Sequence, residues 1–412
     1  MLKQNRFISV ISILGTALAI MMIMTIIVTG EIRNMSMAPE NNRDRTLYVR
    51  YEIQQDTIKN MFNSSNVTRE IVDEYLLKLD TPEAVAAYDI PFFFSDAEFI
   101  TVNREGYPES IHPTLRRVND GYWNVFSYTF LEGAPFSREE FESGVNTAVI
   151  SESTARKLFA REESPVGKTI LIDFNPFRIS GVVKDVSAVF KKAQGDIWVP
   201  YTAYPTYMFE VALLARNTGD FPQVIEEVKN CEKRFATANA PLLLTLPGPS
   251  NNRTNSMSDD WYYSDEEMME MVKIQNRKIT FILLVLVLIP AINLSSFSLS
   301  RMKKRMAEIG IRKAFGARKY TILFQVLYEN MITSLAGGIL GLLLSYLTVY
   351  GLRHWLLDIS ADHSIPVGML VSLPVFLAVF AICILMNLLS AGLPAYRASR
   401  ATIVSSLTQN DR

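Results

Sequence analysis

Residues 301–319 read RMKKRMAEIGIRKAFGARK, and they connect two apolar stretches of the chain. Eight of these residues are Lys or Arg and one is acidic. Apolar side chains recur among the basic ones, because Met302, Met306 and Ile309 share one helix face, while Gly316 is typical of a helix end. The pattern predicts a short amphipathic helix in a loop between two membrane-spanning helices, of the kind that docks onto another molecule.

Four charge-free runs indicate membrane spans, and they cover residues 7–30, 279–300, 330–352 and 364–396. Each run is at least as long as the roughly 20 helical residues that cross a bilayer core. We therefore predict four transmembrane helices over 7–30, 279–300, 320–352 and 364–394. The first run also resembles a signal peptide with Ala17-Leu18-Ala19 as its cleavage site, but its apolar residues continue well beyond Ala19, which favours an uncleaved anchor.

Basic residues predict the orientation, because Lys and Arg gather in short cytoplasmic loops. They occur before the first span, in the 301–319 loop and after the fourth span. We expect residues 1–6, 301–319 and 395–412 on the cytoplasmic side, and residues 31–278 and 353–363 on the outer side. This bias alone would also account for the charge of the 301–319 loop, whose Lys and Arg could equally be solvated or contact lipid headgroups.

Composition is compatible with a chain that lies partly in the membrane: 412 residues, 49% hydrophobic residues and a net charge of -1. Cys231 and Cys383 fall in the outer segment and the fourth span, so we expect no disulfide between them. The 353–363 loop contains His354, Asp358, Asp362 and His363, but their spacing is loose for a metal site and we expect surface residues. We expect no nucleic-acid partner, no metal and no catalytic residues.

The fold class we predict is an α-helical membrane protein with a large α+β outer domain. Residues 45–53 alternate as in a strand, 67–79 have the apolar spacing of a helix, and 85–94 indicate a strand. Residues 208–216, 221–236 and 242–246 repeat the strand, helix and strand order, with Pro222 in the first turn of the helix. Two such units favour a ferredoxin-like module.

Between the two units, residues from about 100 to 205 are predicted to form an inserted mixed lobe. It includes strands at 146–150 and 177–183 and a helix at 152–159 capped by Ser151. Gly167-Lys168-Thr169 resembles the end of a phosphate-binding loop, but Glu162 stands where the first glycine is needed, so we reject nucleotide binding there. Residues 264–278 predict either a solvated linker or a helical stalk continuous with the second span.

Small residues recur every fourth position in the third span, at Gly337, Gly341 and Ser345. Such spacing lets two helices approach closely, and we favour a dimer seam over packing within one subunit. Glu329 lies near the start of this span, and we expect it at the headgroup level rather than in the membrane core.

The stretch RMKKRMAEIGIRKAFGARKYTILFQVLYENMITSLAGGILGLLLSYL resembles the permease signature of the MacB/FtsX group of ABC transporters. The tail LPAYRASRATIVSSL and the outer segments NTAVISESTARKLFAREESPVGKTI and FRISGVVKD are similar to the same group, so the resemblance covers nearly the whole chain. Two features differ from the group: only six residues precede Phe7, and Ala401-Thr402 stands where proline is common.

The resemblance implies a non-catalytic permease subunit with a MacB-like periplasmic core domain (31–278) and an FtsX-like permease domain (279–407). It implies a homodimer or a heterodimer with a related permease in the bacterial inner membrane, and a separate ABC ATPase that uses ATP and Mg²⁺. A periplasmic adaptor or substrate and membrane lipid are further expected partners. The contact residues for the ATPase would be Glu308, Ile309, Arg312, Lys313 and Gly316.

Two functions follow as hypotheses. The first is efflux or extraction of a peptide, drug or lipid-linked substrate, driven by ATP hydrolysis in the partner and by movement of the periplasmic domain. The alternative is a transmembrane regulator that uses the same motion to control a periplasmic partner such as a cell-wall hydrolase or a sensor. A membrane-anchored enzyme is disfavoured, because no compact nucleophile, metal or acid-base group occurs in the sequence.

Overall fold

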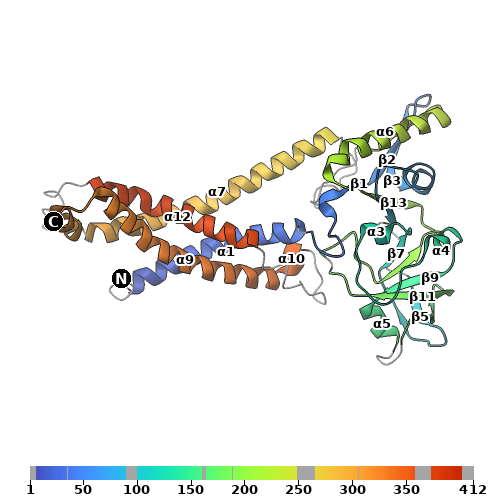
Figure 1. Cartoon of the computed structure of the whole chain (residues 1–412), viewed down its shortest axis with the longest axis horizontal. Coiled ribbons are helices and arrows are strands. Elements are labelled where there is room, and N and C mark those ends of the chain that lie inside the picture. Colours follow the sequence, from blue (N-terminus) through green and yellow to red (C-terminus); the bar gives the residue numbers. More distant parts are fainter. Residues whose placement is uncertain are drawn as a thin grey trace. The chain divides into compact units, whose positions relative to one another are not determined.

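The computed structural model describes residues 6–34, 36–89, 100–159, 164–187, 189–247, 265–304, 306–357 and 373–400. The chain divides into two compact units, of which one comprises Met1–Arg33 with Met271–Arg412 and the other Asn34–Glu270. Helices dominate the first unit, whereas the second is built on a β-sheet (Figure 1).

The helical unit is formed by six helices among the described residues: α1 (Arg6–Asn34), α7 (Asp265–Lys304), α8 (Met306–Ala314), α9 (Lys319–Gly351), α10 (Arg353–Leu357) and α12 (Leu373–Arg400). Within the part of the chain that the structure describes, three segments are long and apolar enough to cross a membrane, namely Ile13–Ile32, Tyr320–Gly351 and Leu373–Ser390. They coincide with three of the predicted spans, whose number and bounds stay predictions. The fourth, 279–300, lies within α7 and stays a prediction.

Apolar side chains join the long helices to one another. Ala19 and Ile23 of α1, Val287 and Ala291 of α7, and Met386 of α12 form one buried cluster. Helix α7 is continuous from Asp265 to Lys304, so the predicted stalk and the second span belong to one helix.

The described residues of the second unit form fourteen strands: β1 (Thr46–Val49), β2 (Tyr51–Asp56), β3 (Met61–Thr68), β4 (Ala84–Asp89), β5 (Val102–Arg104), β6 (Ser110–Ile111), β7 (Leu115–Val118), β8 (Phe130–Gly133), β9 (Thr147–Ser151), β10 (Thr169–Ile172), β11 (Asn175–Val183), β12 (Ile197–Pro200), β13 (Met208–Leu214) and β14 (Leu242–Thr245). Its helices are η1 (Arg43–Arg45), α2 (Arg69–Ile71), η2 (Val72–Leu76), α3 (Tyr122–Val125), α4 (Arg138–Glu142), α5 (Glu152–Leu158), η4 (Thr218–Asp220) and α6 (Phe221–Ala238).

All fourteen strands join in one sheet, whose main order is β14-β2-β3-β13-β4-β7-β12-β9-β11-β10-β5-β6. Strand β1 pairs with β13, and β13 also pairs with β4 in antiparallel register from Phe209 with Asp89 to Leu214 with Ala84. The strands of the two predicted strand-helix-strand units therefore interleave. The inserted lobe joins this sheet through β4 and β7, whose register contains the single pair Tyr88 and Val118.

Several predicted elements of this unit are confirmed. Strand β13 and helix α6, with Pro222 in its first turn, lie where their patterns placed them. Strand β9 is followed directly by α5, and the Ser151 hydroxyl accepts a hydrogen bond from the Thr154 N–H at 3.2 Å, which caps the helix. Burial of alternate residues along β11 agrees with its predicted strand.

The prediction of a helix over 67–79 is wrong at its start. Val67 and Thr68 are the last residues of β3 and pair with Phe209 and Met208 of β13. The helical part is limited to α2 and η2, because pairing across the sheet takes Val67 and Thr68 into a strand. Since β3 also lies between β2 and β13, the ferredoxin-like description stays a prediction, and residues 90–94 of the predicted strand 85–94 lie outside the described residues.

A hydrophobic core fills the inserted lobe. It includes Ile150 of β9, Phe177 of β11 and Ile197 and Val199 of β12, against which Leu158 of α5 packs. Each of the first four side chains is at most 1% exposed. Burial on this scale stabilises a domain by roughly 1.5–3 kcal/mol per large apolar side chain, so the lobe has its own core.

Candidate functional site

The predicted docking helix exists as α8, and its end is built by Gly316. Gly316 has a φ of +89°, a left-handed conformation in which glycine has no steric penalty. The Phe315 N–H bonds to the Ile311 carbonyl at 3.1 Å, and the Ala317 N–H bonds to the Arg312 carbonyl at 3.0 Å. These bonds cap the last carbonyls of α8 and turn the chain into α9, as the sequence predicted.

One predicted contact residue is placed differently from expectation. Ile309 is only 8% exposed and forms a buried cluster with Ile322, against which Ala317, Leu323 and Val326 pack. The side chain of Ile309 thus holds α8 against α9 instead of being exposed, and its role in coupling to the ATPase stays a prediction. Arg312 extends this attachment, since its Nη1 donates to the Gln325 Oε1 at 2.7 Å.

The other predicted contact residues are only partly placed. Glu308 and Arg312 are exposed, and Gly316 lies in the exposed turn. The side chain of Lys313 lies outside the described residues, as does that of Glu329. Of the charged residues in the predicted set, Glu308 and Arg312 are thus on the accessible part of α8.

The structure adds two apolar residues that the prediction missed. Ile311 of α8 is 51% exposed, and Phe315, which directly follows the last residue of α8 and lies four residues after Ile311, is 89% exposed. Tyr320 and Phe324 at the start of α9 are also exposed. Their spacing is visible in the sequence, but the choice between the Ile309 face and the Ile311 face depends on where α9 lies.

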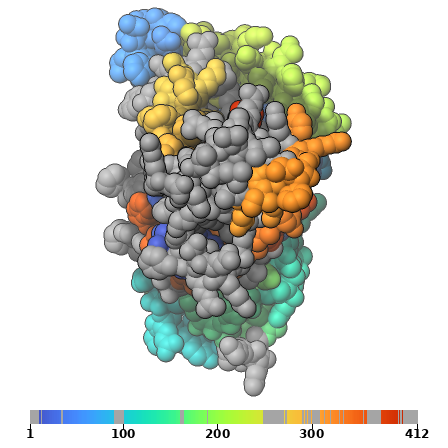
Figure 2. Space-filling model, turned by 90° about the vertical axis from the view of Figure 1, so that its left-hand side faces the viewer, coloured from blue at the N-terminus to red at the C-terminus, as the bar shows by residue number. Residues whose placement is uncertain are grey.

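Figure 2 shows a group of orange atoms at the surface, whose colour on the bar corresponds to residues that follow position 300. A large aromatic side chain that is almost fully exposed, with basic residues on both sides in the sequence, is typical of a contact surface for another macromolecule. The described geometry thus gives α8 an attached face and an accessible face.

The glycines of α9 pack within the subunit. A Cβ atom added to Gly341 would lie 2.7 Å from the Ala17 carbonyl oxygen and 2.9 Å from the Ile20 Cβ of α1. One added to Gly337 would lie 2.8 Å from the Thr16 Cβ. These contacts support close packing inside the subunit, the alternative interpretation of the glycines, and the dimer seam stays a prediction.

The remaining contacts of α9 involve α12. A Cβ on Gly338 would meet the Cys383 sulfur of α12, and the Asn387 Nδ2 donates to the Leu327 carbonyl at 2.9 Å. Ser345 is fully buried, and its hydroxyl bonds to the Leu342 carbonyl of its own helix at 2.7 Å. Helix α9, which follows α8 directly, is thus fixed by both α1 and α12.

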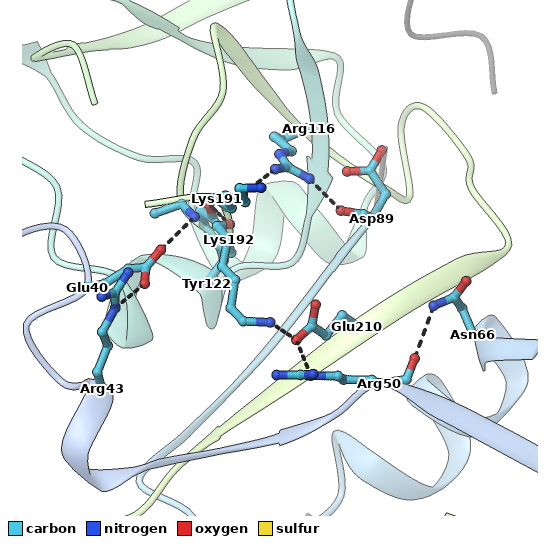
Figure 3. Close-up of polar contacts among 11 residues, drawn as sticks. Glu40, Arg43, Arg50, Asn66, Asp89, Arg116, Tyr122, Lys191, Lys192 and Glu210 are labelled. Carbon is cyan, nitrogen blue, oxygen red and sulfur yellow. Dashed lines mark hydrogen bonds and ion pairs between the residues drawn. The ribbon is translucent and has the colours of Figure 1, made fainter. Parts of the chain in front are cut away.

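Buried charges form a second notable feature, in the sheet unit (Figure 3). Glu210 of β13 forms ion pairs with Lys192 and with Arg50, whose Nε lies 3.6 Å from the Glu210 Oε1. Burial favours the neutral form of Glu210, but the two cations outweigh it and hold the pKa of this carboxyl below its ordinary value. Glu210 is therefore an anion whose partners come from distant parts of the chain.

Other predicted positions have plain structural roles. The Gly167 N–H bonds to the Ile179 carbonyl at 2.8 Å, and the Lys168 Nζ lies over the Phe159 ring, so this turn is tied to the sheet.

Cys231 and Cys383 are free and buried. Asp358, Asp362 and His363 lie outside the described residues, and the described part of the chain has no group of three His, Cys, Asp or Glu side chains that could hold a metal.

Two known protein-family domains match the sequence of this chain. The MacB-like periplasmic core domain matches residues 9–230, and the FtsX-like permease C-terminal domain matches residues 280–403. The chain belongs to the MacB/FtsX-type family of ABC transporter permeases. Because helices α8 and α9 fall in the second match, the accessible face of α8 lies within the permease domain of this family.

Among its relatives, the permease is 28% identical over 243 residues to the macrolide export ATP-binding/permease protein MacB of Hahella chejuensis, covering 58% of this chain and 35% of that protein. It is 27% identical over 248 residues to the ABC transporter permease YknZ of Bacillus subtilis, covering 58% of each chain. The permease therefore spans only part of the length of the relatives that it matches.

Solved structures similar to the permease include the extracellular domain of YknZ from Gram-positive bacteria, with a TM-score of 0.35 and 20% identity, covering 48% of this chain and 99% of that one. The periplasmic region of MacB from Actinobacillus actinomycetemcomitans aligns with a TM-score of 0.34 and 15% identity, covering 49% and 88% of the two chains.

Proposed function

We propose that this permease works as a dimer with a separate ABC ATPase and couples ATP hydrolysis in the cytoplasm to conformational change of its periplasmic domain. The coupling serves efflux or extraction of a peptide, drug or lipid-linked substrate from the periplasmic side. Support comes from the family and from relatives named as ATP-binding/permease proteins. ATP and Mg²⁺ would be bound by the ATPase subunit, with no cofactor on this chain.

The observation that supports the ATPase contact most directly is the two-faced arrangement of α8. Ile309 fixes one face on α9, so that force applied to α8 reaches the long helix without slack. Ile311 and Phe315 are left exposed on the other face, where a partner can bury them. We therefore assign the ATPase contact to Ile311 and Phe315, flanked by Glu308, Arg312 and Lys313.

Replacing Phe315 with alanine is expected to weaken association with the ATPase at least tenfold, because an aromatic anchor contributes about 2 kcal/mol or more to an interface. The measurement is recovery of the ATPase with tagged permease in mild detergent. Phe174→Ala is the matched control, since Phe174 is equally 89% exposed but lies in the sheet unit. Recovery of the ATPase with Phe315→Ala at the level of the unsubstituted permease would contradict the assignment.

The same two positions test the proposed orientation in the inner membrane. A cysteine at Phe174 is expected to react with a membrane-impermeant maleimide in intact cells, whereas a cysteine at Phe315 should react only after the membrane is opened. The native Cys231 and Cys383 are buried and give a low background. Labelling of Phe315→Cys from outside would show that α8 is not cytoplasmic and would remove the ATPase contact.

A further inference from the structure

The segment that follows α1 is tied into the inserted lobe within a few residues. The chain leaves α1 at Asn34, and the Pro39 carbonyl already accepts a hydrogen bond from the Ser127 N–H at 2.8 Å. The Asn42 Nδ2 donates to the Val125 carbonyl at 3.2 Å. Both partners lie in or next to α3, so residues 39–42 are held by the lobe before the first strand begins.

Two charged side chains of this segment reach a single loop. Glu40 and Arg43 are 3% and 6% exposed and form an ion pair with each other (Figure 3). The Glu40 Oε1 accepts from the Ala193 N–H at 3.2 Å, and the Arg43 guanidinium lies 5.1 Å from the centre of the Phe190 ring. Both side chains thus contact the loop of residues 189–196 that precedes β12.

The lobe holds this loop from its other side. Arg116 of β7 donates to the Gln194 and Lys191 carbonyls, each at 2.7 Å, and the Tyr128 hydroxyl donates to the Ala193 carbonyl. The Ala193 N–H, besides Glu40, also meets the Phe190 carbonyl at 3.0 Å. Loop 189–196 is therefore hydrogen-bonded to Arg116 and Tyr128 of the lobe and contacted by the charged side chains of the segment that follows α1.

We propose that Glu40 and Arg43 form a clamp through which displacement of α1 is delivered to loop 189–196 and hence to the inserted lobe. This inference rests on the proposed function, in which movement of the membrane helices drives the periplasmic domain. Asn34 and Glu40 are six residues apart, which limits the slack between them to about 20 Å of extended chain. A long flexible linker would absorb the displacement instead.

The charge chemistry suits a clamp. Glu40 and Arg43 are removed from water together, so separating them leaves a buried charge without its partner, and the pair resists sliding over the loop. A purely apolar contact has no direction and can slip by one residue, whereas a carboxylate bonded to a specific backbone N–H fixes the register. The clamp thus specifies where the segment grips the loop.

The test uses the full permease with its co-purified ATPase. Hydrogen exchange of the backbone amides of residues 189–196 is measured in two states of the complex, without nucleotide and with ATP and vanadate. In the unsubstituted complex, exchange is expected to differ at least about threefold between the two states. Glu40→Ala should abolish this difference while ATP hydrolysis and ATPase recovery persist. Glu83→Ala is the matched control, because Glu83 pairs with Arg45 at the end of the same segment and is half exposed.

A second pair of variants keeps the test decisive if Glu40→Ala fails to fold. Arg43→Lys retains the cation and should retain the nucleotide-dependent difference, whereas Arg43→Gln should lose it. An unchanged difference in Glu40→Ala or Arg43→Gln overturns the clamp. If the unsubstituted complex hydrolyses ATP but hydrogen exchange in 189–196 does not change, the clamp is overturned and the proposed function is not. If no ATPase is recovered with the unsubstituted permease, the clamp and the proposed function are both overturned.

Discussion

Replacing Glu210 with glutamine is expected to destabilise the sheet unit by about 3–5 kcal/mol, because Lys192 and Arg50 would be left as buried cations without an anion. The change keeps the size of the side chain, so the loss reports charge rather than packing. Unfolding of the full permease can be followed by tryptophan fluorescence, since Trp198 is buried in the same unit and lies near Tyr128.

The control for this variant is Glu142→Gln. Glu142 pairs with Arg138 on the surface, with side-chain exposures of 58% and 75%, and such a pair contributes at most about 1 kcal/mol. Equal destabilisation by the two substitutions would contradict the assignment of Glu210 as the anion of a buried network. Loss of at least half of the unfolding free energy only in Glu210→Gln would agree with it.

The same residue gives the permease a pH dependence of defined sign. The pKa of Glu210 is lower in the folded protein than its ordinary value of 4.5, since Lys192 and Arg50 outweigh the cost of burial. Its stabilising contribution is therefore complete above pH 4.5 and is lost as the pH falls through the folded pKa. Acidification should narrow the stability gap between Glu210→Gln and the unsubstituted permease.

Replacing Gly341 with leucine is the second substitution with a large expected effect. Even a Cβ at this position would lie 2.7 Å from the Ala17 carbonyl oxygen, which belongs to the backbone of α1 and cannot rotate away. Overpacking of this kind costs about 1–3 kcal/mol or more, so the helical unit should unfold at a lower temperature in detergent. Gly392→Leu in α12 is the control, since nothing lies within 4 Å of its added Cβ.

This experiment also separates the two interpretations of the glycine spacing. Close packing with α1 predicts that Gly341→Leu lowers the thermal stability of each subunit, whatever its oligomeric state. A dimer seam at the same face predicts fewer dimers by size-exclusion chromatography with unchanged subunit stability. The contacts of Gly337 and Gly341 with Thr16, Ala17 and Ile20 lead us to expect the first result.

Local patterns in the sequence were sufficient to predict those elements whose tertiary contacts favour the same secondary structure as their own residues do. The amphipathic helix α6, the Ser151 cap of α5 and the Gly316 stop of α8 were all predictable in this way. Strand β3 was not, because MFNSSNVT has little apolar alternation and is held in the sheet by its pairing with β2 and β13. Interactions between distant strands decided its structure.

The functional residues show the same difference between what local sequence patterns predict and what depends on distant contacts. A docking helix at 306–314 could be predicted, but its buried and exposed faces could not, because they depend on the position of α9. Glu40, Arg43 and Glu210 were missed altogether. Charged residues are usually on the surface, and the partners that allow these residues to be buried include Ala193 for Glu40 and Arg50 for Glu210, both far away in the sequence.

The pairing of β4 with β13 has a consequence for how this family can diversify. Strands β4 and β13 are adjacent and antiparallel, and the whole inserted lobe lies between them in the sequence, where a hairpin would have only a loop. Insertions at such points change the length of a chain with little cost to the sheet that frames them. Relatives could therefore exchange or resize this lobe to recognise different molecules while the frame and the membrane helices stay the same.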